Sequence, residues 1–152
     1  MTVLTSSGTC SASESIINGL RGVGVQVFQI GATTCGKPFG FYPEDNCGTT
    51  YFSIQFQGVN AQGFGEYTDG FSPSSSASAT GAAVPGCVVG DDFNHALGDP
   101  AEGRLAAALR YLADRSCPGG TTGSTTSAAA EAAANDGVMY KSPWRENRIL
   151  RR

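Results

Sequence analysis

Residues 7–31, "SGTCSASESIINGLRGVGVQVFQIG", carry the pattern that decides the fold. Ser11 and Glu14 have the spacing of a capping box, in which each side chain bonds the other residue's backbone N–H. Apolar residues then recur at helical spacing and predict a helix from about Ser11 to Leu20. The run "VQVFQIG" is typical of a strand buried on both faces of a parallel sheet. With the β-prone "TVLTSS" at residues 2–7, this stretch predicts a strand–helix–strand unit and an α/β fold. The positions predicted to face the core are Ile16, Ile17 and Leu20.

The composition is that of one globular domain. The chain has 152 residues, of which 40% are hydrophobic and only 15% charged, and its net charge is -3. The body has no basic patch, which argues against nucleic-acid binding. Five of the ten Lys and Arg residues lie in the last twelve, "KSPWRENRILRR", which we interpret as a solvated basic tail. We expect no membrane-spanning segment and find no signal-peptide pattern in this chain.

The five cysteines are not arranged for metal binding. No C-x-x-C pair occurs, so we predict no metal site and no cofactor. Cys35 and Cys47 flank a loop rich in glycine and proline, whereas Cys87 and Cys117 flank a predicted helix. Either pair is a candidate disulfide, which would indicate an oxidising compartment, and Cys10 is then left unpaired. Buried free cysteines are an equally open alternative.

After residue 31 we predict loops, two strands and one helix. Residues 32–48 form a long loop, 49–59 a strand, 63–71 a weaker strand and 72–86 a flexible connector. A helix is predicted within residues 99–116, with Asp99 as its cap and Pro100 in its first turn. We divide the chain into a domain at 1–117, a low-complexity linker at 118–137 and the basic tail at 138–152. The predicted buried face of the second helix is Leu105, Leu109 and Leu112.

Ser11 is either a helix cap alone or also a nucleophile, and a nucleophile requires a base. The single histidine, His95, lies in a polar loop, and the chain contains no G-x-S-x-G motif. Lys37, in "TTCGKPFG", follows the second strand. The loop after the second strand of such a unit returns to the edge where the helix begins. Lys37 is therefore a candidate base for Ser11, with a solvated loop lysine as the alternative.

The stretch that contains Ser11 and Lys37 resembles the tail-specific, or C-terminal processing, serine proteases. That family carries Ser-Ala-Ser-Glu at the start of a helix, then a strand ending in Gly, then Thr-x-Gly-Lys. The corresponding residues here run from Ser11 to Glu14, then Gly31, then from Thr34 to Lys37. The similarity continues through "GEYTDGFSP", "DDFNHALGDPAEGRLAAALRYL" and "KSPWRENRIL".

The resemblance implies a serine-type endopeptidase with a ClpP/crotonase-like spiral of β and α units. By this match Ser11 is the nucleophile, Lys37 the general base, and the N–H of Ala12 an oxyanion donor. The implied partner is a polypeptide bound near its C-terminus, and the implied location is the periplasm or cell envelope. The family often has a glutamine four residues after the lysine, where this chain has Phe41. Gln55 or Gln57 are possible replacements for it.

In this family a substrate-gripping domain and the first half of the spiral precede the nucleophile. With its nucleophile at residue 11, the chain is expected to be the C-terminal part of the catalytic domain, with doubtful activity alone. One alternative is a non-catalytic secreted interaction module whose cysteines form disulfides. Another is a crotonase-like enzyme acting on thioesters, although no placed carboxylate pair supports it.

Overall fold

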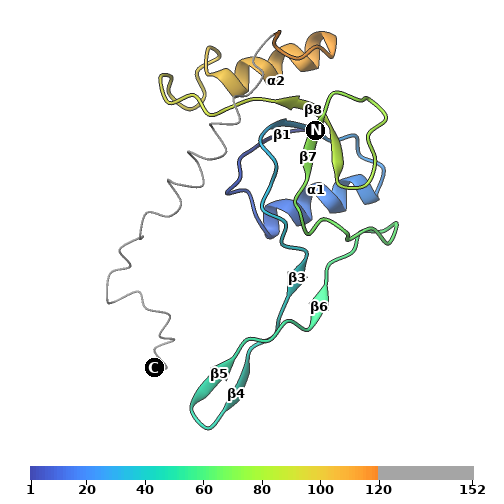
Figure 1. Ribbon diagram of the computed structural model, residues 1–152, viewed down its shortest axis with the longest axis vertical. Coiled ribbons are helices and arrows are strands. Elements are labelled where there is room, and N and C mark those ends of the chain that lie inside the picture. The colour runs from blue at the N-terminus through green and yellow to red at the C-terminus, as the bar shows by residue number, and fades with distance from the viewer. Residues whose placement is uncertain (120–152) are drawn as a thin grey trace.

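A parallel four-stranded sheet forms the centre of the protein. The computed structural model describes residues 1–119, and its sheet has the order β1-β2-β8-β7 (Figure 1). The strands are β1 (Thr2–Thr5), β2 (Phe28–Gly31), β7 (Ser72–Ser74) and β8 (Ala83–Val88). Each neighbouring pair runs parallel. The chain between β1 and β2 contains α1 (Ala12–Gly22), so the predicted strand–helix–strand unit and the α/β class are confirmed.

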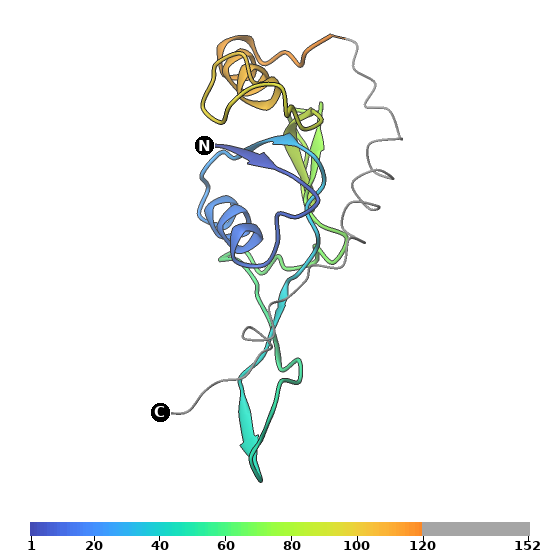
Figure 2. The same cartoon turned by 90° about the vertical axis from the view of Figure 1, so that its left-hand side faces the viewer.

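The sheet is covered on both faces by different apolar clusters. On one face Phe28 and Ile30 of β2 pack with Cys87 and with Ala108 and Tyr111 of α2 (Gly103–Asp114). The other cluster comprises Ile17, Val27, Tyr67, Phe71 and Val84. Successive side chains of an extended chain point to opposite faces, so Val27, directly before β2, lies in the second cluster while Phe28 lies in the first. Figure 2 shows the two helices on opposite sides of the sheet.

Helix α1 forms where its capping pattern and periodicity predict it. Ser11 is its N-cap residue, and the Ser11 N–H donates to Glu14 Oε2 at 2.9 Å. Ile17 is buried and Leu20 packs against the same cluster, but Ile16 is 55% exposed. The predicted buried stripe is therefore wrong at Ile16, which lies one residue off the face that Ile17 and Leu20 share.

The segment predicted as a flexible connector, residues 72–86, instead supplies strands β7 and most of β8. Strand β8 is central in the sheet, and Val84 and Cys87 are buried in it. Gly86 lies so close to β2 that an added Cβ would collide with the carbonyl oxygen of Gln29. Gly86 is thus required by the close approach of two strand backbones.

Helix α2 is shorter than predicted and presents another face. Its N-cap is Glu102, not Asp99, and the Glu102 carboxylate accepts from the N–H groups of Arg104 and Leu105 at 3.0 and 2.8 Å. The predicted buried leucine face is wrong, because Leu109 and Leu112 are 49% and 51% exposed. Ala107 and Ala108 on the buried face allow the helix to approach the sheet closely. The buried residues of α2 are Arg104, Ala107, Ala108 and Tyr111.

An arm of two short antiparallel ribbons projects from the end of the sheet (Figures 1 and 2). At the base of the arm, β3 (Phe39–Gly40) pairs with β6 (Phe56–Gln57). At its tip, β4 (Glu44–Asn46) pairs with β5 (Thr49–Tyr51). The single strand predicted over residues 49–59 is therefore wrong, and residues 63–71 form turns and loops rather than the predicted weaker strand. Apolar side chains exposed on the arm include Phe39, Phe41, Tyr42, Tyr51, Phe52, Ile54 and Phe56.

Only one of the two candidate disulfides is present in the structure. Cys87–Cys117 is confirmed, with a Cα–Cα distance of 5.5 Å. Cys35 pairs with Cys10 instead of Cys47, with a Cα–Cα distance of 5.3 Å. Cys47 is free and exposed at the turn of the arm's tip, where the ribbon carries it away from the body. Two disulfides are typical of proteins from oxidising compartments.

None of the helices within residues 1–119 is both long and apolar enough to cross a membrane. The predicted linker from residue 120 onward and the predicted basic tail lie outside the described residues.

Candidate active site

Ser11 stands at the junction between the loop after β1 and the first turn of α1. Its backbone has φ 55° and ψ -109°, a conformation that non-glycine residues rarely adopt and that costs of order 1–3 kcal/mol. Its carbonyl oxygen accepts from the N–H of Ser15 at 2.9 Å, and its side chain is exposed. A strained serine between a strand and a helix is the setting in which several hydrolases present their nucleophile.

The Glu14 carboxylate holds this turn in place by hydrogen bonds. Its carboxylate is fully buried (0% exposed) and accepts four hydrogen bonds. Oε1 accepts from Thr34 Oγ1 at 2.6 Å and from the Gly36 N–H at 2.7 Å. Oε2 accepts from the backbone N–H groups of Ser11 and Lys37 at 2.9 and 2.8 Å. Burial raises the pKa of Glu14, but the bonds from Thr34, Lys37, Gly36 and Ser11 outweigh it, and the net pKa lies below the ordinary value.

One oxygen atom therefore joins the two predicted catalytic residues. The backbone nitrogens of Ser11 and Lys37 lie close together, because both donate to Glu14 Oε2. The structure confirms that the loop after β2 returns to the start of α1. The side chains of Ser11 and Lys37 are both exposed, so both are open to a ligand arriving from solvent.

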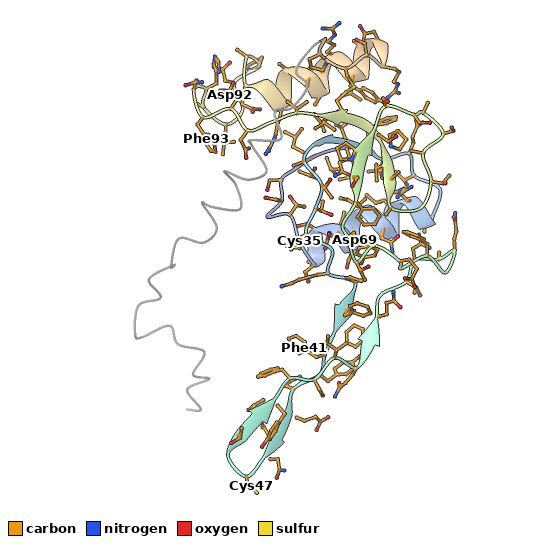
Figure 3. The ribbon with its side chains drawn as sticks, viewed as in Figure 1. Cys35, Phe41, Cys47, Asp69, Asp92 and Phe93 are labelled. Carbon is orange, nitrogen blue, oxygen red and sulfur yellow. A yellow bond between two sulfur atoms is a disulfide. The ribbon has the colours of Figure 1, made fainter. Side chains whose placement is uncertain are left out.

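Two further links connect the same segments. The Cys10–Cys35 disulfide joins the residue before Ser11 to the loop that carries Lys37. Beside it, the Cys35 N–H donates to the carbonyl oxygen of Thr9 at 3.0 Å. Figure 3 shows Cys35 at the end of the body from which the arm projects. Together with Glu14, these contacts fix the turn at Ser11 against the loop that carries Lys37.

The lysine loop is also held from its other side. The Thr34 N–H donates to the Phe71 carbonyl oxygen at 3.0 Å, and the Phe71 N–H donates to Thr34 Oγ1 at 2.7 Å. Gly36 has φ 79°, and a Cβ there would collide with the carbonyl oxygen of Thr68. Thr34 Oγ1 thus accepts from Phe71 and donates to Glu14, so its hydroxyl links the two segments.

A buried polar network supports the base of the loop. Gln29 is fully buried in β2, and its Nε2 donates to the carbonyl oxygens of Phe71 and Ala32 at 2.8 and 3.0 Å and to Thr5 Oγ1 at 3.0 Å. Thr5 Oγ1 in turn donates to the Ala32 carbonyl oxygen at 2.7 Å. These bonds connect β1, β2 and the residue before β7 at the base of the loop, whereas Gln29 Oε1 has no hydrogen-bond partner within residues 1–119.

The remaining predicted site residues have different outcomes. Ala12 is the first residue of α1, where an N–H has no acceptor within the helix and the helix dipole favours negative charge. Phe41 lies on the arm, with its ring 5.3 Å from that of Phe52. Gln55 Oε1 accepts from the Tyr42 N–H at 2.9 Å, and Gln57 Nε2 donates to the Gly65 carbonyl oxygen at 2.9 Å. Both amides are therefore engaged by backbone groups rather than by Lys37.

His95 lies elsewhere, on the loop between β8 and α2. Its Nδ1 is 2.7 Å from Asp92 Oδ2, and this hydrogen bond raises the pKa of His95 above its ordinary value. Figure 3 places Asp92 beside α2 and away from Cys35. The histidine is thus not brought to the Ser11 site.

Sequence reasoning assigned Glu14 only to the helix cap and missed its bonds to Thr34, Gly36 and Lys37. An acidic residue at the third helical position was the available signal, whereas nothing local pointed to Thr34. Among residues 1–119 no cluster of three His, Cys, Asp or Glu side chains could hold a metal ion.

Comparisons of the chain with models of protein families, with curated proteins and with solved structures found no match in any of the three.

Proposed function

We propose that this chain carries the catalytic dyad of a serine-type endopeptidase of the tail-specific kind. The observation that carries the proposal is the strained backbone of Ser11 at the start of α1, held beside the Lys37 loop by one buried carboxylate. Strained non-glycine residues cluster at functional sites, where the surrounding structure must hold them. A helix cap alone needs neither the strain nor the bond to Lys37.

In the proposed reaction the Ser11 hydroxyl oxygen attacks the carbonyl carbon of a peptide bond. Lys37 Nζ takes the hydroxyl proton and later donates it to the departing amine, which leaves an acyl group on Ser11. Water then attacks this ester, with Lys37 again as base, and releases the acid product. The Ala12 N–H and the N-terminal end of α1 stabilise the negative oxygen of each tetrahedral intermediate.

This role requires Lys37 to be uncharged when it accepts the proton. Lysine is protonated in water at neutral pH, and removal of water favours its neutral form. Lys37 is exposed within the described residues. Its desolvation in the proposed mechanism therefore comes from the bound polypeptide or from protein outside residues 1–119.

A fluorophosphonate probe tests the nucleophile, because it labels only an activated serine. We expect the wild-type chain to be labelled and Ser11→Ala to be unlabelled. Ser13→Ala is the matched control, since Ser13 is also exposed in the first turn of α1 and its loss should leave labelling unchanged. Lys37→Ala should slow labelling strongly. Labelling that persists in Ser11→Ala, or that disappears in Ser13→Ala, contradicts the assignment.

We also propose a ClpP/crotonase-like spiral as the fold and the periplasm as the compartment. The parallel sheet with helices on both faces is compatible with a ClpP/crotonase-like spiral. The two disulfides favour an oxidising compartment, for which we propose the periplasm. The polypeptide substrate is proposed to bind near its C-terminus.

A second candidate is a non-catalytic secreted interaction module. The observation that favours it is the arm, whose exposed aromatic side chains include Phe41 and Tyr42. Under this alternative the probe labels neither wild type nor Ser13→Ala. Truncation of the arm, rather than substitution of Ser11, would then abolish its interactions.

A further inference from the structure

We infer that the Cys10–Cys35 disulfide is a positioning element of the proposed dyad, and that only the oxidised form is competent. This inference rests on the proposed function and adds to it a dependence on redox state. Cys10 directly precedes Ser11, and Cys35 precedes Lys37 by two residues. The cross-link therefore joins the two short segments that carry the nucleophile and the base.

The contacts around the disulfide explain why it acts on position. The Ser11 backbone is strained, and strain persists only where neighbouring contacts hold it. On one side of Ser11 the Glu14 carboxylate fixes the Ser11 N–H. On the other side, the disulfide and the bond from the Cys35 N–H to the Thr9 carbonyl oxygen hold residues 9 and 10. Without the cross-link, the segment before Ser11 loses its covalent attachment and the strained turn can relax.

Both sulfur-bearing residues are only partly buried, so a dithiol can reach them. Reduction transfers two electrons and two protons from the dithiol, which becomes a disulfide, and leaves Cys10 and Cys35 as thiols. The chemical class of the partner is thus a dithiol reductant. We expect such a reductant to lower the reactivity of Ser11 without unfolding the sheet, because both core clusters remain.

The second disulfide provides a matched control. Cys87–Cys117 closes a loop of 30 residues and Cys10–Cys35 one of 25, so their effects on the entropy of the unfolded chain are nearly equal. Cys87–Cys117 joins β8 to the segment after α2, away from Ser11. Removal of Cys87–Cys117 should lower the melting temperature at least as much as removal of Cys10–Cys35, because Cys87 is also buried in the core, and only removal of Cys10–Cys35 should change the reactivity of folded Ser11.

The experiment compares C10S/C35S with C87S/C117S in a C47S background, which prevents exchange with the free thiol of Cys47. Fluorophosphonate labelling is measured about 15 °C below each melting temperature. We expect labelling of C10S/C35S to be slower by about tenfold to a hundredfold, since small displacements of reacting groups have effects of this size. C87S/C117S should label like its parent. Equal rates in the two variants, or equal losses, would overturn the inference.

The C47S/C87S/C117S chain, which retains only Cys10–Cys35, tests reversibility. Reduction by dithiothreitol should slow labelling, and reoxidation should restore it, while the circular dichroism spectrum stays unchanged. Global unfolding on reduction would also overturn the inference, because the disulfide would then support the whole fold rather than the site.

Hydrogen exchange separates this inference from the proposed function. Reduction should speed exchange of the Ser11 and Lys37 amides about tenfold or more, and leave the amide of Ile30 in β2 protected. If the oxidised parent is never labelled, the proposed function fails, but the exchange rates still decide whether the disulfide positions the two segments. Unchanged exchange at Ser11 and Lys37 on reduction would refute the positioning role.

Discussion

Glu14→Gln combines a minimal change of shape with a large expected loss of stability. Glutamine keeps one acceptor oxygen and replaces the other by an NH2 group. Two of the four donors then lose their acceptor and face another donor: either Ser11 and Lys37, or Thr34 and Gly36. A hydrogen bond to a charged group contributes about 1.5–3 kcal/mol. The free energy of unfolding should therefore fall by about 3–6 kcal/mol, a large share of the roughly 5–15 kcal/mol of a typical domain.

Urea unfolding followed by circular dichroism at pH 7 measures this loss. With an m-value of about 2 kcal/mol/M, the midpoint should fall by about 1.5–3 M. Glu66→Gln makes the same chemical change at an exposed position and should alter the free energy of unfolding by less than about 0.5 kcal/mol. A Glu14→Gln midpoint equal to that of Glu66→Gln would refute the reasoning.

The pH dependence of the same comparison has a definite sign. The pKa of Glu14 in the folded protein lies below its ordinary value, whereas the unfolded chain has a value of about 4.3. The stabilisation by the ionised carboxylate is thus fully present above about pH 4.3 and is lost as the pH falls through the folded pKa. The difference between wild type and Glu14→Gln should stay constant from about pH 7 to 5 and narrow below about pH 4. A difference that widens on acidification would contradict the assigned bonds.

Two paired substitutions test other parts of the structure by urea unfolding. Gly36 and Gly48 both have φ 79°, but only Gly36 lies against another backbone, at Thr68. Gly48→Ala should lower the free energy of unfolding by about 1–2 kcal/mol, and Gly36→Ala should lower it by clearly more. Equal losses would argue against the close contact at Thr68. Tyr111→Ala should cost about 3–5 kcal/mol and Leu112→Ala less than about 1 kcal/mol, because Tyr111 is buried and Leu112 is 51% exposed. The reverse order would restore the leucine face as the packed side of α2.

The strand–helix–strand unit was predictable because its signals are local. The capping box at Ser11 and Glu14, the helical spacing of Ile17 and Leu20, and the apolar run ending at Gly31 lie within 25 consecutive residues. The return of the lysine loop to α1 then followed from the topology of parallel strands. These parts of the site were therefore available from the sequence.

Strands β7 and β8 were not predictable because their neighbours decide their structure. Pro73, Pro85 and Gly86 are turn-forming residues in isolation. In the sheet, Gly86 permits the close approach of β2, and Val84 enters the cluster beneath α1. Contacts distant in sequence here override local propensity.

The buried face of α2 and the disulfide pairing also depend on long-range contacts. The leucine stripe of α2 is more apolar, but the sheet accepts the side with Ala107, Ala108 and Tyr111. Cys35 is closer in sequence to Cys47 than to Cys10, yet the arm carries Cys47 away and α1 brings Cys10 near. Sequence separation therefore gave the wrong partner.

The strand order has a consequence for synthesis on the ribosome. Strand β2 lies between β1 and β8, but β8 is translated about 50 residues later. At about 5–20 residues per second, the nascent chain waits roughly 3–10 s between these two strands. During this interval one edge of β2 has no partner, and Phe28 and Ile30 lack the cover that α2 later provides. We expect this half-built sheet to be the stage at which the emerging chain most needs a chaperone.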